Sequence, residues 1–121
     1  MIRTLLIVAL SLSLAGIASG APRVLGHPEA SYELSLKDLR MPSSSAGSVT
    51  LRTCAACQSV THRVDGATIY LAGNTPMLLP DFLNYAQSLS AANPDDRVLV
   101  GVYYDVESAV VTRIIVLDHR N

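Results

Sequence analysis

Two short segments near the middle of the chain alternate apolar and polar residues with the period of two that is typical of half-buried β-strands. They are residues 49–53, VTLRT, and residues 59–64, SVTHRV. A third segment, residues 68–72, follows the turn dipeptide Asp65-Gly66 and ends at Gly73-Asn74. The pattern predicts a meander of three antiparallel strands.

The periodicity then becomes helical. Pro80 and Asp81 are residues typical of a first helical turn, and apolar residues recur after them at spacings of three and four. The segment ends at Asn93-Pro94. We therefore expect one amphipathic helix of about three turns, with its apolar face formed by Phe82, Leu83, Ala86 and Leu89.

The last two predicted strands, residues 97–104 and 109–117, are rich in valine and isoleucine. Residues 105–108 join them. A connecting loop with three or five residues would pair two apolar faces, whereas a loop with four residues would place Arg113 opposite Val100 on the packed face. We expect the odd loop, which pairs Val98, Val100, Val102 and Tyr104 with Val110, Thr112, Ile114 and Val116.

The order strand, strand, strand, helix, strand, strand is also the order of the OB-fold, a small five-stranded barrel. Residues 48–118 resemble the small exported OB-like barrels of bacteria. The resemblance lies in the run from Val49 through Thr68-Ile69-Tyr70, in Leu79-Pro80-Asp81 and in Arg97-Val98-Leu99-Val100. It implies a mainly β fold with one helix, arranged as an OB-like barrel or a strongly curved sheet. It implies no functional residue.

The N-terminus resembles a secretory signal peptide. Arg3 precedes an apolar run over residues 5–15, and the small residues Ala18, Ser19 and Gly20 supply a cleavage site before Ala21. A lipid anchor would need a cysteine where Ile17 stands. We therefore predict that residues 1–20 are removed, and that the mature protein is exported to the periplasm or the medium without a stable membrane anchor.

Residues 21–47 have the composition of a loop, with Pro22, Gly26 and Pro28 before Pro42 and then three consecutive serines. We expect a loosely structured N-terminal segment ahead of a barrel domain at residues 48–121. One stretch in it, residues 32–36, alternates in polarity and could add an edge strand.

Charge limits the class of partner. The chain has 9 basic and 10 acidic residues, a net charge of −1, and the two signs are dispersed. Because no basic stripe is present in the sequence to contact phosphates, we do not expect nucleic acid as a partner. An unidentified protein or small ligand fits the composition better.

The cysteines, Cys54 and Cys57, stand in a C-x-x-C spacing that suits a disulfide, a redox site or half of a metal site. Export favours a disulfide. With Ala55 and Ala56 as a two-residue hairpin connection, the cysteines face each other on the polar side of the hairpin, and a bridge would add about 2 kcal/mol. Alanine suits the positive φ of such hairpin turns poorly, which gives the bridge a structural reason.

A redox site of the thioredoxin type would need a helix after the cysteines to stabilise a thiolate. Residues 58–62 favour a strand instead. A zinc site would need further ligands. His62 lies five residues after Cys57 and so on the other strand face, which favours a hydrogen-bonded histidine, while His27 and His119 are too far in sequence to place.

Other chemical motifs are sparse. Two acidic pairs, at residues 95–96 and at Asp105 with Glu107, fit turn chemistry, and we expect no catalytic residue, cofactor or metal. Tyr103, on the opposite face from Tyr104, and Arg52 are the candidate ligand contacts. The sequence predicts an exported small binding or structural module with a Cys54–Cys57 disulfide. A thiol-disulfide redox protein and a metal-handling protein are the alternatives.

Overall fold

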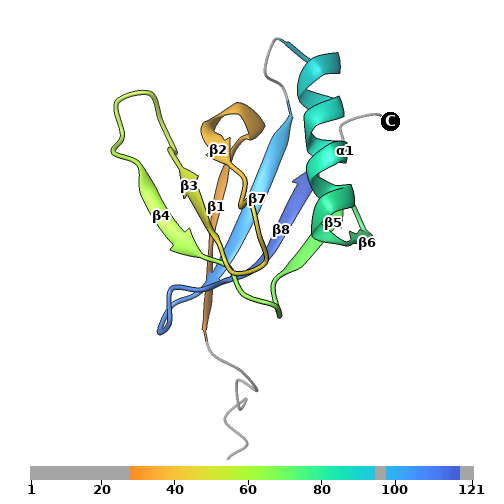
Figure 1. Cartoon of the computed structure of the whole chain (residues 1–121). Helices are drawn as coiled ribbons and strands as arrows, with labels where there is room; N and C mark the ends of the chain where they lie inside the picture. Colours follow the sequence, from red (N-terminus) through yellow and green to blue (C-terminus); the bar gives the residue numbers. More distant parts are fainter. Residues whose placement is uncertain (1–27, 95–97, 118–121) are drawn as a thin grey trace, which may run out of the picture.

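The computed structural model describes residues 28–94 and 98–117, and in this part the chain is mainly β with one α-helix (Figure 1). The predicted signal peptide, His27, His119 and the acidic pair at residues 95–96 lie outside the described residues. The strands are β1 Glu29–Ser35, β2 Leu39–Arg40, β3 Ser48–Leu51, β4 Val60–Arg63, β5 Ile69–Ala72, β6 Thr75–Met77, β7 Leu99–Asp105 and β8 Val111–Leu117. A 3-10 turn, η1 Leu36–Asp38, separates β1 from β2, and the helix α1 is Leu79–Ala92.

The strands form two sheets. The larger sheet has the order β1-β7-β8-β5-β6, in which β5 and β8 are parallel and the other neighbours antiparallel. The smaller sheet has the order β2-β3-β4 and is antiparallel. The prediction of a mainly β fold with one helix is confirmed.

A closed barrel does not form among the described strands, and that part of the prediction is wrong. Pairing is interrupted at two corners. The 3-10 turn η1 ends β1 before β2 begins, and residues 64–68 separate β4 from β5. Because a β ladder needs extended backbone on both sides, each corner divides what would have been one curved sheet.

The predicted three-strand meander is also wrong in its last member. β5 does not pair with β4 but lies parallel to β8 in the larger sheet. The Asp65 turn makes this change of sheet: the Ala67 N–H donates to Asp65 Oδ1 (2.9 Å), and the Thr68 hydroxyl donates to the Val111 carbonyl (2.7 Å). The second bond fixes the corner to β8, so the turn directs the chain across the molecule rather than back along β4.

Residues 29–40 were expected to be loosely structured, and the structure corrects this. They form β1, η1 and β2, and β1 pairs along its whole length with β7. The expected strand at residues 32–36 is confirmed, since β1 lies at an edge of the larger sheet. The proline and glycine content suggested a loop over the whole segment, whereas the alternation of Tyr32 and Leu34 correctly indicated the strand.

The hydrophobic core lies between the two sheets and the helix. α1 begins and ends where the sequence predicted and buries Phe82, Ala86 and Leu89. The valines and isoleucine of one face of the larger sheet and the leucines and valines of β3 belong to the same buried cluster as these helical residues. α1 and the smaller sheet therefore cover the same face of the larger sheet.

The last hairpin has the predicted register over most of its length. Val100 pairs with Val116 and Val102 with Ile114, and residues 106–110 join the strands, a five-residue loop. A bulge after Tyr103 then shifts the register, so that Tyr104 pairs with Val111 and Thr112 has no partner of its own. Val111 is buried for this reason, in place of the predicted Val110 and Thr112.

A cluster of His62, Tyr32 and Tyr104 connects the two sheets. The His62 ring is buried, with Nδ1 at 2.8 Å from the Ala109 carbonyl and Nε2 at 3.1 Å from the Tyr32 hydroxyl. Because a carbonyl only accepts, Nδ1 carries the proton, and in the neutral ring Nε2 accepts from the phenol. The sequence prediction of a hydrogen-bonded histidine is confirmed.

The hairpin β5–β6 was not predicted. Its two-residue loop is Gly73-Asn74, and Gly73 has φ of +60°. Positive φ at the first loop residue is typical of a type II′ hairpin turn.

Among the described residues, no helix has both the length and the apolar character needed to span a membrane.

Candidate functional site

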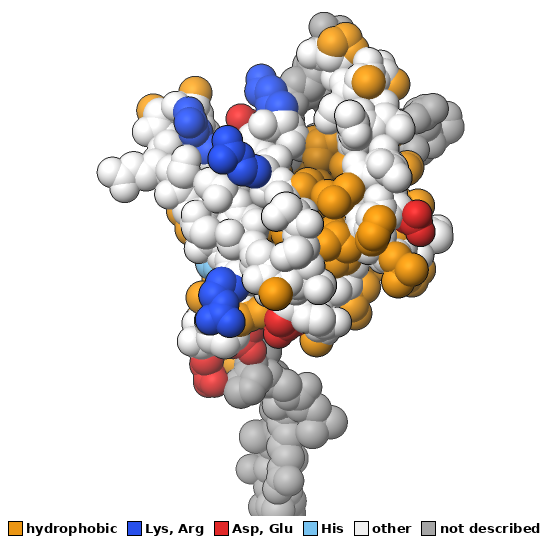
Figure 2. Space-filling model, viewed as in Figure 1, with side chains coloured by type: hydrophobic (Ala, Val, Ile, Leu, Met, Phe, Trp, Pro, Cys, Tyr) orange, Lys and Arg blue, Asp and Glu red, His pale blue; other side chains and the backbone are white. Residues whose placement is uncertain are grey.

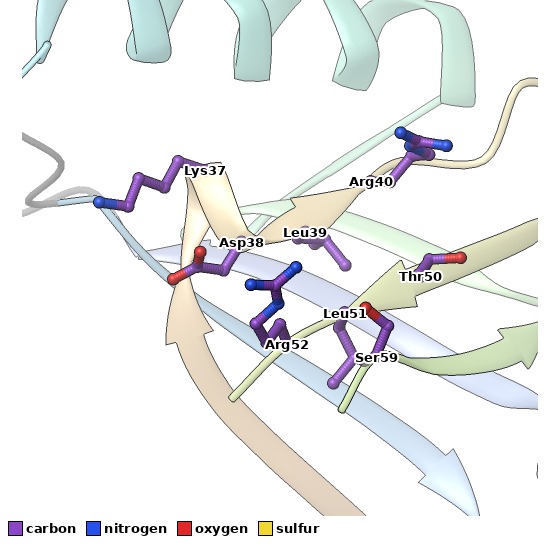
Figure 3. A pocket seen from close by; sticks show the side chains of 8 residues that line it. All are labelled: Lys37, Asp38, Leu39, Arg40, Thr50, Leu51, Arg52 and Ser59. Carbon is purple, nitrogen blue, oxygen red and sulfur yellow. The ribbon is translucent and has the colours of Figure 1, made fainter. Parts of the chain in front are cut away.

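A pocket of about 670 Å³ lies on the outer side of the smaller sheet (Figure 3). We call it the basic pocket, because three of its side chains are basic and one is acidic. η1, β2, β3 and the loop between β3 and β4 all contribute to it. Its lining residues are Lys37, Asp38, Leu39, Arg40, Thr50, Leu51, Arg52 and Ser59.

Strand register explains why these polar side chains share one face. Arg40 pairs with Thr50, and Thr50 pairs with Thr61. Residues two apart in a strand point to the same side, so Arg52 follows Thr50 onto this face. The Arg52 N–H donates to the Asp38 carbonyl at 3.0 Å, which continues the pairing one step beyond the strand ends. The predicted polar face of the hairpin is thus the wall of the basic pocket.

Positive charge gathers at this site although the whole chain has a net charge of −1. Figure 2 shows basic side chains grouped over the smaller sheet and η1. In Figure 3, Arg52 extends toward Asp38, whereas the guanidinium of Arg40 lies beyond Leu39 and points away from Arg52. Both arginines are exposed, and neither forms an ion pair with another described residue. Their guanidinium groups are therefore free to bind an anion.

The predicted disulfide between Cys54 and Cys57 is present, with a Cα–Cα distance of 5.0 Å. It lies in residues 52–59, which we call the disulfide loop. The Cys57 N–H donates to the Cys54 carbonyl at 3.1 Å, so the four residues from Cys54 to Cys57 form a β-turn. The ends of this loop, Arg52 and Ser59, both line the basic pocket.

The predicted hairpin register is confirmed, but the turn is of another type. Val49 pairs with His62 and Leu51 with Val60, as expected. Ala55 and Ala56, however, do not have positive φ, since Ala109 is the only non-glycine residue in the described part of the chain that does. A turn with negative φ splays the strands. This explains why pairing stops at Leu51 and Val60 instead of reaching the cysteines.

Among the described residues, no helix begins at the cysteines, as would be needed to activate a thioredoxin-type thiolate. The chain after Cys57 enters β4 at Val60, and α1 begins only at Leu79. Cys54 is exposed and Cys57 is half-buried. Geometry therefore favours a structural bridge that solvent thiols can reach.

Tyr103 and Arg52, the two candidate ligand contacts, are not brought together. Tyr103 lies on β7, on the face of the larger sheet opposite to the core, and is covered by Arg113, whose guanidinium carbon is 4.0 Å from the ring centroid. Arg113 also forms an ion pair with Glu29 at 3.4 Å. Only Arg52 belongs to the basic pocket.

Sequence reasoning missed Lys37, Asp38 and Arg40, because the segment that contains them looked like a loop. The alternation of Leu36, Leu39 and Met41 with charged residues was the signal that could have indicated them.

His62 is buried on the inner side of the smaller sheet, away from the face that carries Arg52, as strand parity predicted. In residues 28–94 and 98–117, no group of three or more His, Cys, Asp or Glu side chains is arranged to bind a metal ion.

Comparisons with protein families, curated proteins and solved structures find no match to this chain.

Proposed function

We propose that this protein is an exported small binding module that binds an anionic small ligand in the basic pocket. The observation that carries the proposal is the pair of exposed arginines, Arg40 and Arg52, which have no ion-pair partner among the described residues and line one concave site. Guanidinium groups donate several hydrogen bonds in a planar fork that matches carboxylate and phosphate oxygens. The Ser59 hydroxyl adds a further donor, and the Thr50 hydroxyl can donate to a ligand when it accepts its 3.1 Å hydrogen bond from Thr61.

Export is part of the proposal. It is supported by the basic and apolar pattern of residues 1–20 and by a disulfide, which persists mainly in oxidising compartments.

We also propose that the fold is related to the small exported OB-like barrels, opened at two corners. The order of neighbours supports this. β1 and β2 are consecutive halves of one bent segment, and so are β4 and β5. Through these bends the neighbours run β1, β7, β8, β5, then β4, β3, β2 and back to β1. α1 lies between β5 and β7 in the chain, the place that the OB-fold gives its helix.

The binding proposal is tested by titrating the oxidised protein with two anions, pyrophosphate as a phosphate probe and citrate as a carboxylate probe, by calorimetry and by NMR shifts. We expect saturable binding of at least one anion, weakened by added salt. Arg52→Gln and Arg40→Gln should each weaken it about fivefold to tenfold.

Arg63→Gln is the matched control, because it removes the same charge from an exposed strand position outside the basic pocket. It should leave affinity within about twofold. Equal losses for all three variants would mean that only net charge attracts the anion, and an absence of saturation for both anions would exclude the proposed function.

A further inference from the structure

We propose that the Cys54–Cys57 disulfide sets the anion affinity of the basic pocket, so that reduction by a dithiol weakens binding of the ligand. This inference rests on the proposed function and adds a regulation of the same site. Its basis is position: the disulfide closes the loop whose two ends, Arg52 and Ser59, line the basic pocket.

The disulfide loop has few other constraints. None of its side chains is buried, and Cys57 alone is half-buried. The ladder between β3 and β4 ends at Leu51 and Val60, so it does not reach the loop. Apart from the turn bond between Cys57 and Cys54, the loop backbone is fixed at one end by the bond from Arg52 to the Asp38 carbonyl. The covalent bridge is therefore the main restraint on the tip.

The chemistry is a complete thiol-disulfide exchange. A thiolate of the dithiol attacks the sulfur of Cys54, which is the exposed cysteine, and Cys57 leaves as a thiolate. The second thiol of the dithiol then attacks the mixed disulfide and releases Cys54. The protein gains two electrons and two protons, and the dithiol becomes a disulfide.

Loss of the disulfide weakens anion binding because the disulfide loop becomes less ordered. In the reduced protein residues 53–58 sample more conformations. This loosens Ser59 directly, and it loosens the side chain of Arg52, whose backbone keeps its bond to the Asp38 carbonyl. Binding must then order these side chains, which costs affinity. Arg40 belongs to β2, outside the loop, so its contribution should not depend on the disulfide.

The test is a set of pyrophosphate titrations at neutral pH, with and without dithiothreitol, which is uncharged there and does not compete for the arginines. We expect reduction to raise the Kd of the wild-type protein roughly fivefold. Cys54→Ser/Cys57→Ser should bind like the reduced wild type and should not respond to dithiothreitol. Circular dichroism of each sample shows that the fold is retained.

A double-mutant cycle gives the sharper measurement. Arg52→Gln should cost more affinity in the oxidised than in the reduced state, whereas Arg40→Gln should cost the same in both. Equal affinity of oxidised and reduced wild type, with binding present, would overturn this inference and leave the proposed function intact. If the oxidised protein binds no anion, it is the proposed function that fails.

Discussion

Single residues in this protein are fixed by bonds that join distant segments. His62 is an example, because its ring connects β4 to Tyr32 on β1 and to the Ala109 carbonyl after β7. That second bond holds a residue with an unusual backbone: Ala109 has φ of +61°. Left-handed backbone costs an alanine about 1 kcal/mol, and glycine avoids most of this cost.

We therefore expect Ala109→Gly to raise the free energy of unfolding by about 0.5–1 kcal/mol. Ala56→Gly is the control, since Ala56 has ordinary negative φ in an exposed turn and glycine there adds only flexibility. Urea denaturation measures both. A loss of stability in Ala109→Gly equal to that of the control would show that φ at this position carries no strain.

Tyr70 presents a different residue-scale problem, because its buried hydroxyl has no hydrogen-bond partner among the described residues. Tyr70→Phe should keep the ring packing against Phe82 and raise the free energy of unfolding by about 1 kcal/mol near neutral pH.

Burial, together with the negative charge of Asp65, raises the pKa of Tyr70 above the ordinary value of about 10. The Tyr70 phenol therefore ionises less readily in the folded state than in the unfolded state. Its neutral form contributes its full share to folding stability below the unfolded-state pKa, and this share is lost as pH rises through the folded-state pKa. The advantage of Tyr70→Phe over wild type should therefore grow above about pH 10. Denaturation at a series of pH values from 7 to 11 measures the free energy of unfolding of both proteins. A difference between them that stays constant over this range would contradict the prediction.

At the scale of elements, the helix begins without a side-chain cap. The N-cap residue of α1 is Leu78, which has extended backbone, makes no capping bond and is 75% exposed. Pro80 and Asp81 in the first turn support the helix start. The backbone N–H groups of the first helical turn therefore receive no hydrogen bond acceptor from the side chain of the N-cap residue.

Leu78→Ser should supply that acceptor and raise the free energy of unfolding by about 1 kcal/mol. Little packing is lost, because the leucine is mostly in solvent. Leu78→Ala is the control for removal of the leucine alone. Thermal unfolding should rank serine above alanine, and an equal melting temperature for the two would show that the hydroxyl does not cap the helix.

For the whole molecule, the disulfide is peripheral to the core, which lies between the sheets and α1. Cys54→Ser/Cys57→Ser should therefore fold to the same structure and lose about 2 kcal/mol, the contribution of a short closed loop. Urea denaturation gives the loss. Nearly unchanged NMR shifts at Phe82 and Ile114 would agree with this placement, whereas global unfolding of the variant would show that the bridge is required for the fold.

Most local structure could be predicted from the sequence. Period-two alternation located β3 and β4, helical spacing located α1, and face matching gave the register of the first hairpin and most of the last. The weaker predictions concern the basic pocket. Arg52 was identified, but Lys37 and Arg40 lie in η1 and β2, which the loop composition of their segment hid. Their proximity to Arg52 depends on pairing between β2 and β3.

The sequence by itself determined the cysteine pairing, the helix, the main strands and the inward face of most of those strands, because these follow from neighbours within a few residues. The tertiary structure alone decided that β5 leaves the meander to lie parallel to β8, that the sheets separate at η1 and at Asp65, and that three basic residues line one pocket. These outcomes depend on bonds between distant residues, such as Thr68 to Val111 and Arg52 to Asp38, whose partners no local pattern specifies.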